Sequence, residues 1–184
     1  MEWTSPQYLY TKIYEFQQKY PDFFFTPPSK FCKDQGWNLI PYSTYEKVAR
    51  EISEDGFCYI DNGEYNIFYN KTKPPTRQKF TICHEIGHIY LNHHKTVNPK
   101  LLKYGSKFTG VWETQANIFA HNILMPAKYM DSMKPFGVEE VSKAFGLSKA
   151  MVEVRFAKLD QDKKWLKAVE NIIKAQDIKS VPKL

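Results

Sequence analysis

Residues 80–91 have the sequence FTICHEIGHIYL, in which a His-Glu-x-x-His pattern occupies positions 84–88. On a helix, side chains four positions apart lie on one face, about 6 Å from each other. His84 and His88 can therefore bind one tetrahedral Zn²⁺ with bonds of about 2.0–2.1 Å. Glu85 can accept a proton from water and return it as a general acid. The spacing predicts a zinc site, and the alternative is a pair of exposed helix residues without a metal.

The residues around this pattern predict a helix from about residue 77 to 93, with Thr76 as its N-terminal cap. A glycine costs a helix about 1 kcal/mol relative to alanine. Gly87 therefore indicates that another helix or backbone segment approaches the metal face closely. An apolar stripe beside the two histidines favours packing of the helix on a sheet. The stripe consists of Phe80, Cys83, Gly87 and Leu91.

A catalytic zinc site needs a third protein ligand and one open position. His93 and His94 are out of phase with His88 on a continuous helix, and a sharp bend would be needed to bring either back. Glu113 lies on a second predicted helix, 111–124, from which it can reach the metal. We prefer Glu113, with His121 as the runner-up, although a glutamate in a first helical turn is also favoured simply by the helix dipole.

The second helix offers two further polar side chains near its ligand candidate. Asn117 follows Glu113 by four residues, so we expect it on nearly the same face, where it can hydrogen-bond a ligand. The reaction also needs a donor that stabilises the oxyanion. The sequence does not choose among its candidates for this role, which are Tyr90, His93, His94, Tyr104 and His121.

The segments outside the two motif helices predict a small sheet and a helical C-terminal region. Asn62-Gly63 is a strong hairpin signal, so residues 57–60 and 64–69 should form paired strands. We expect residues 21–42 to be a loop, and an exposed edge of the hairpin to accept a substrate strand. Residues 138–159 have the outline of a helix-turn-helix.

The composition is that of a globular protein. The chain has 184 residues, of which 42% are hydrophobic and 25% charged, so it is neither disordered nor collagen-like. Its three cysteines, Cys32, Cys58 and Cys83, form no Cys-x-x-Cys pair and indicate reduced thiols. The first residues do not resemble a signal peptide, and no apolar run approaches the roughly 18 residues of a membrane span. We therefore expect a cytoplasmic protein with no membrane partner.

Two segments together resemble the ImmA/IrrE family of zinc metallopeptidases. The first is RQKFTICHEIGHIYLNH and the second is ETQANIFAHNILMP. The family shows Arg-x-x-Phe-Thr-x-x-His-Glu-x-Gly-His and, later, Glu-x-x-Ala-Asn-x-Phe-Ala before Leu-Met-Pro. The resemblance covers about residues 40–160. The matching residues are Arg77, Phe80, Thr81, His84, Glu85, Gly87, His88, Glu113, Ala116, Asn117, Phe119, Ala120, Leu124, Met125 and Pro126.

The resemblance implies that His84, His88 and Glu113 bind Zn²⁺ and that Glu85 is the catalytic base. It also implies an α+β fold, in which a small antiparallel sheet packs against zincin-type helices. We expect a metallopeptidase domain over residues 1–134 and a helical, helix-turn-helix-like subdomain over 135–184. Family members cleave or help inactivate helix-turn-helix repressors of mobile elements, such as prophages, or of stress regulons, so the expected partner is such a repressor.

Two other classes of function stay open. One is a regulatory protein that keeps the fold and binds a repressor or DNA without cleavage, and the other is a structural zinc protein with a closed site. DNA binding would use the helix-turn-helix-like segment, whose cations are interspersed with acidic residues, and the competing role is a docking surface. Its cations are Lys143, Lys149, Arg155 and Lys158, and its acidic residues are Glu139, Glu140 and Glu153.

Overall fold

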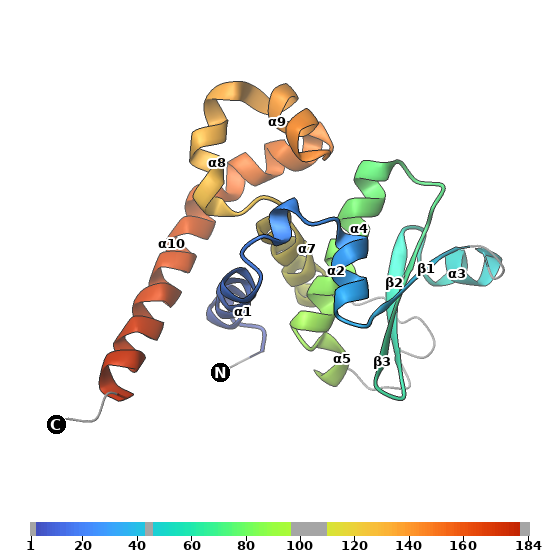
Figure 1. Cartoon of the computed structure of the whole chain (residues 1–184), viewed down its shortest axis with the longest axis horizontal. Helices are drawn as coiled ribbons and strands as arrows, with labels where there is room; N and C mark the ends of the chain where they lie inside the picture. The colour runs from blue at the N-terminus through green and yellow to red at the C-terminus, as the bar shows by residue number, and fades with distance from the viewer. Residues whose placement is uncertain (1–2, 43–45, 97–109, 181–184) are drawn as a thin grey trace.

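A computed structural model of the chain describes residues 3–42, 46–96 and 110–180 (Figure 1). The N-terminal part begins with helices and ends in a sheet. Its elements are α1 (Pro6–Lys19), the 3₁₀ turn η1 (Phe23–Phe25), α2 (Pro28–Asp34), β1 (Asn38–Pro41), α3 (Glu46–Ile52), β2 (Gly56–Asp61) and β3 (Glu64–Tyr69). The remainder is helical. Its elements are α4 (Pro75–Tyr90), α5 (His93–Thr96), α7 (Val111–Leu124), α8 (Ala127–Met133), η2 (Lys134–Phe136), α9 (Gly137–Phe145) and α10 (Lys149–Ser180).

The predicted hairpin is confirmed. Strands β2 and β3 pair antiparallel, with Phe57 opposite Phe68, and turn at Asn62 and Gly63, whose φ angles are 49° and 84°. Both residues adopt positive φ at low cost, which is why Asn-Gly closes two-residue hairpins. The fold class is therefore α+β, as predicted.

The prediction of a loop over residues 21–42 is wrong. The segment contains η1, α2 and the strand β1, which pairs parallel with β3 in the order β1-β3-β2. The sheet is thus mixed rather than purely antiparallel. A strand of four residues that includes a proline carries little local signal. It forms here because β3, which is distant in the sequence, offers it a ladder of hydrogen bonds.

Helices α4 and α7 pack side by side and form the centre of the molecule (Figure 1). A Cβ atom added to Gly87 would lie only 3.3 Å from the Ala116 carbonyl oxygen and 3.3 Å from the Phe119 ring. The close approach expected from this glycine is therefore confirmed, and its partner is α7. The predicted bounds of 111–124 for α7 are also confirmed.

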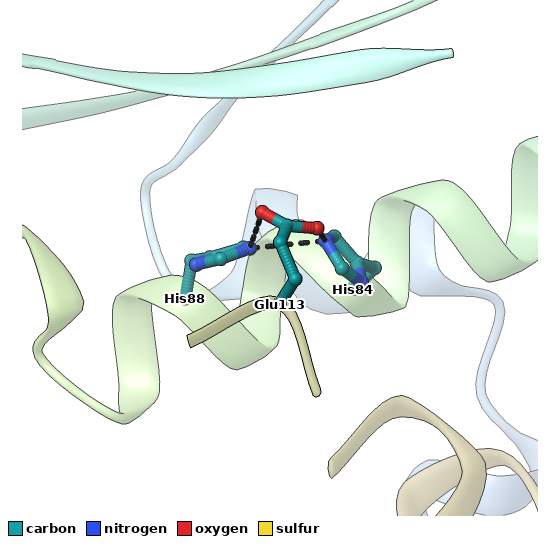
Figure 2. Close-up of side chains that lie close together, drawn as sticks. All are labelled: His84, His88 and Glu113. Carbon is teal, nitrogen blue, oxygen red and sulfur yellow. Dashed lines mark hydrogen bonds and ion pairs between the residues drawn. The ribbon is translucent and has the colours of Figure 1, made fainter. Parts of the chain in front are cut away.

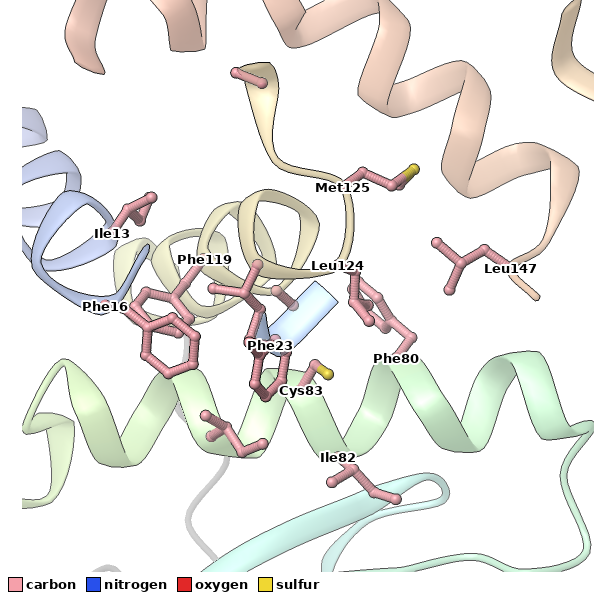
Figure 3. Close-up of a cluster of buried hydrophobic side chains, with 14 of the residues drawn as sticks. Ile13, Phe16, Phe23, Phe80, Ile82, Cys83, Phe119, Leu124, Met125 and Leu147 are labelled. Carbon is pink, nitrogen blue, oxygen red and sulfur yellow. The ribbon is translucent and has the colours of Figure 1, made fainter. Parts of the chain in front are cut away.

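The main core lies between α1, α4 and α7 and is rich in aromatic rings (Figure 3). Phe16 of α1 is 1% exposed and packs against Phe119 of α7 and Tyr90 of α4, with ring centroids 5.3 and 4.9 Å apart. Burial of one such phenylalanine contributes about 1.5–3 kcal/mol. The N-terminal helix, which lies outside the two motifs, thus holds both motif helices in place.

The C-terminal region has the predicted helix-turn-helix outline, because α9 ends at Phe145, Gly146 caps it, and α10 begins at Lys149. Helix α10 then continues without a break to Ser180. Its middle packs along α1, where Trp165 stacks on Tyr10 with ring centroids 5.9 Å apart. The division of the chain into domains at residues 134 and 135 stays a prediction.

Candidate metal centre

Helix α4 presents His84 and His88 on one face, one turn apart. Their Nε2 atoms point toward each other and lie 2.9 Å apart (Figure 2). The helix runs unbroken through both histidines. Pro74 and Asn92, which limit it at its two ends, lie outside the pattern. The arrangement expected from the i, i+4 spacing is thus present.

Glu113, in the first turn of α7, places its carboxylate between the two imidazoles (Figure 2). Its Oε2 atom lies 3.2 Å from His84 Nε2, and its Oε1 atom lies 3.4 Å from His88 Nε2. The close packing of α7 on α4 at Gly87 makes this contact possible. Sequence reasoning preferred Glu113, and it is the candidate that the structure brings to the histidine pair.

The donor set suits a zinc ion. Ligand atoms of His84, His88 and Glu113 all lie within 4.8 Å of one another. Atoms bound to one tetrahedral zinc at about 2.0–2.1 Å are about 3.3 Å apart, which is close to the separations seen here. The Glu113 side chain is 39% exposed, so solvent reaches the cluster. Three candidate ligands and access for water fit the donor set of a catalytic rather than a closed zinc site.

The electrostatics of the cluster favour a positive charge. Burial alone would raise the pKa of Glu113, but the two imidazoles lower it to about 2. Burial acts to lower the pKa of His84, but the Glu113 and Glu85 carboxylates outweigh it and raise that pKa above its ordinary value. A site that attracts a proton in this way also attracts a metal cation.

Each imidazole is held from behind by a hydrogen bond at Nδ1. His84 Nδ1 lies 2.9 Å from Asn117 Oδ1, so the expected contact between Asn117 and a candidate ligand is confirmed. His88 Nδ1 lies 2.8 Å from His93 Nδ1. Such contacts typically orient histidine ligands and leave the opposite nitrogen free for a metal.

The role of His93 behind His88 was missed from the sequence. Helix α4 ends at Tyr90, three residues earlier than predicted, and Asn92 follows with φ 56°. That bend returns His93 to the ligand pair, where it lies fully buried behind His88. Asparagine adopts this conformation more readily than most residues, so Asn92 is the signal that indicated the bend.

Glu85 is 5% exposed and lies on the side of α4 that faces the sheet. Burial raises the pKa of the Cys58 thiol on β2, and the charge and hydrogen bonding of Glu85 raise it further. Burial also raises the pKa of Tyr42, with a second contribution from the Glu85 charge. The Glu85 carboxylate therefore lies between α4 and the edge strand β2, beside the imidazole pair.

The other candidate residues lie elsewhere. The His94 ring contacts Tyr65 of β3, and the Tyr90 ring lies in the core. His121 packs on Phe80 with ring centroids 5.2 Å apart, and burial lowers its pKa. None of these three belongs to the cluster formed by described residues. Tyr104 lies outside the described residues.

Three of the four cations of the helix-turn-helix-like segment are poorly placed for phosphate contacts, and Lys158 is exposed. Arg155 is fully buried. Lys143 lies 3.1 Å from Glu140, and Lys149 forms an ion pair with Glu139. These contacts favour a structural or docking role over DNA binding, because phosphate contacts need clustered, available cations.

A family model agrees with this site. The model of peptidase family M78, the IrrE N-terminal-like domain, matches residues 44–157. The chain belongs to this family. Membership makes the chain a peptidase and implies a metal ion and a protein substrate, and the match includes His84, His88 and Glu113. A comparison with curated proteins gives no match. Within the described ranges, no helix is long and apolar enough to cross a membrane.

Proposed function

We propose that this member of the M78 family is a zinc-dependent endopeptidase that cleaves a helix-turn-helix transcriptional repressor of a mobile element or stress regulon. The observation that carries the proposal is the convergence of His84, His88 and Glu113, whose ligand atoms lie within 4.8 Å of one another beside Glu85. The two imidazoles and the carboxylate would hold the ion. Bound zinc supplies Lewis acidity toward water and a peptide carbonyl.

Glu85 acts as the general base and then as the general acid. Its carboxylate accepts a proton from the attacking water and returns one to the amine of the leaving peptide. Its place between α4 and the sheet brings it close to a peptide lying along that side of the cluster. His84 and His88 are kept in position by Asn117 and His93.

The substrate binds as an added strand on β2. In the described part of the chain β2 is an edge strand, because β3 pairs with it on one side only. Cys58 of β2 neighbours Glu85, so a peptide paired with the outer edge of β2 passes close to the base. Backbone hydrogen bonds then give affinity, and side-chain pockets give sequence preference.

The choice of a repressor as substrate rests on the family resemblance of the two motifs. The site alone supports only the cleavage of a protein. A repressor encoded beside this gene is the first substrate to test, and its incubation with the zinc-loaded chain should give two defined fragments.

The variant Glu85→Gln tests the mechanism. It removes the proton acceptor but keeps the size of the side chain, so zinc should stay bound while cleavage stops. Zinc content is measured by atomic absorption and cleavage by gel electrophoresis. Cleavage at the wild-type rate would remove Glu85 from its role. Binding of the repressor without cleavage by the wild-type chain would instead favour a regulatory protein.

A further inference from the structure

A chain of hydrogen bonds, part-buried at its outer end and buried at its inner end, runs from the backbone of Trp3 to the metal centre. Gln115 Nε2 lies 3.2 Å from the Trp3 carbonyl oxygen, and Gln115 Oε1 lies 3.1 Å from His93 Nε2. His93 Nδ1 lies 2.8 Å from His88 Nδ1. Gln115, His93 and His88 are each at most 3% exposed. The two buried contacts of His93 each need a donor matched to an acceptor.

The Trp3 carbonyl fixes the direction of this chain. A carbonyl oxygen only accepts, so the amide nitrogen of Gln115 must be the group that faces it. The Gln115 oxygen then faces His93 and also only accepts. His93 must therefore carry a hydrogen on Nε2 and donate it to Gln115.

The tautomer of His93 in turn fixes the tautomer of His88. A neutral imidazole with its hydrogen on Nε2 has a lone pair on Nδ1. That lone pair accepts the hydrogen on His88 Nδ1, and His88 in turn keeps its lone pair on Nε2. This is the atom that lies 2.9 Å from His84 Nε2 and 3.4 Å from Glu113 Oε1.

We propose that Gln115 and His93 are positioning residues that hold His88 in its Nδ1–H tautomer and keep its Nε2 lone pair directed at the metal. The inference rests on the metal centre proposed above. In the other tautomer, a hydrogen would occupy the place of the ion and would have to be displaced on binding. His84 has an independent acceptor, Asn117, so it serves as a reference within the same molecule.

Nuclear magnetic resonance of the histidine ring nitrogens tests the tautomer directly. The full chain is stripped of metal with a chelator and studied at alkaline pH. We expect His88 and His84 to carry their hydrogens on Nδ1 in the wild-type chain. This readout does not depend on proteolytic activity. His88 with its hydrogen on Nε2 would overturn the inference.

Two substitutions of Gln115 separate hydrogen bonding from packing. Gln115→Met keeps the shape but removes the acceptor, whereas Gln115→Glu keeps an acceptor toward His93 and loses only the donor toward the Trp3 carbonyl. We expect Gln115→Met to give a mixture of His88 tautomers and to weaken zinc binding about 10-fold or more, in the range of other partners of histidine ligands. Gln115→Glu should retain the wild-type tautomer and most of the affinity. His84 should stay unchanged in both.

A role in packing alone predicts the reverse order, in which methionine is tolerated and glutamate is not. That order overturns the inference, as does a zinc affinity of Gln115→Met within about threefold of wild type. Zinc affinity is measured by competition with a coloured chelator on the full chain. If the wild-type chain binds zinc with the expected tautomer but cleaves no protein, the proposed function fails and this inference stands.

Discussion

Helix α7 contributes to two polar clusters, one near each of its ends, and they differ in kind. Near its C-terminal end, Asn122 joins Arg155 and Asp162 in a structural cluster. Near its N-terminal end, Glu113 joins His84 and His88 in the metal cluster. Both bring nitrogen and oxygen atoms together, but the structural cluster is buried whereas the Glu113 side chain of the metal cluster is 39% exposed.

In the structural cluster, donors and acceptors are matched. Arg155 donates to the Met125 carbonyl, to Asn122 Oδ1 and to Asp162. Asp162 also accepts from the Asn122 amide and from the Tyr10 hydroxyl, whose pKa is raised by burial and by this contact. The cluster ties α10 to α1 and α7. Fully satisfied networks of this kind rigidify a fold.

In the metal cluster, potential metal ligands face one another. Two Nε2 atoms and a carboxylate converge, and the electrostatics favour a positive charge among them. The difference shows how to separate a structural polar cluster from a functional one. A structural cluster balances its own donors and acceptors, whereas a site that binds an ion leaves the balance to the ion.

The largest expected effect is on the structural cluster. Arg155→Met leaves the Asp162 carboxylate buried without its cation, so the free energy of unfolding should fall by about 3–5 kcal/mol. Urea unfolding at neutral pH measures it. Lys163→Met is the control, because it breaks an exposed ion pair with Asp131 and should leave the free energy of unfolding almost unchanged. Equal losses of unfolding free energy in the two variants would contradict the view that the buried cluster stabilises the fold more than the exposed ion pair does.

The next effect is on the metal cluster. Glu113→Gln removes the carboxylate, and zinc affinity should fall by more than about 100-fold, because lost partners of ligands already cost about 10–100-fold. Competition with a chelator measures the affinity. Glu140→Gln, at an exposed site on α9, should leave it unchanged. Undiminished zinc binding by Glu113→Gln would exclude this residue as a ligand.

A smaller effect is expected where α4 meets α7. Gly87→Val forces a side chain against the Ala116 backbone, and overpacking of this kind costs about 1–3 kcal/mol. Thermal unfolding gives the stability, and zinc affinity reports whether Glu113 has moved. Ala144→Val on the exposed side of α9 changes helix propensity by only about 0.7 kcal/mol or less. If both variants lose the same stability, the contact at Gly87 is not tight.

The smallest effect concerns a surface contact beside the hairpin. Arg77 Nη2 lies 2.6 Å from Asp55 Oδ2, and this hydrogen bond lowers the pKa of Asp55 below its ordinary 3.8. Asp55→Asn should cost about 0.2–1 kcal/mol at neutral pH. Because the folded-state pKa is the lower one, this stabilisation is present above pH 3.8 and is lost as the pH falls through the folded-state value. A difference in stability between the wild-type chain and Asp55→Asn that grows as the pH falls would contradict the pairing of Asp55 with Arg77.

Much of the candidate site was predictable because its pattern is local. The i, i+4 spacing of His84 and His88 fixes their common face on any helix, and Asn117 follows from the same spacing on α7. Asn62 and Gly63 likewise specify a turn through their own backbone preferences. Such features depend on residues a few positions apart, so no distant partner is needed to foresee them.

Other features required the tertiary structure. The chain reverses at Asn92 and so places His93 behind His88. On a continuous helix the spacing of these two histidines would keep them apart. Strand β1 exists because β3 pairs with it, and a short proline-containing segment does not reveal that alone.

The sequence by itself determined the histidine pair on one helix, the hairpin and the bounds of the second motif helix, because periodicity and turn preferences act within a few residues. Only the tertiary structure decided that Glu113, and not His94 or His121, joins the Nε2 atoms of that pair, and that His93 lies behind His88. The reason is that a contact between helices depends on how closely they pack, and here the absence of a side chain at Gly87 lets α7 approach.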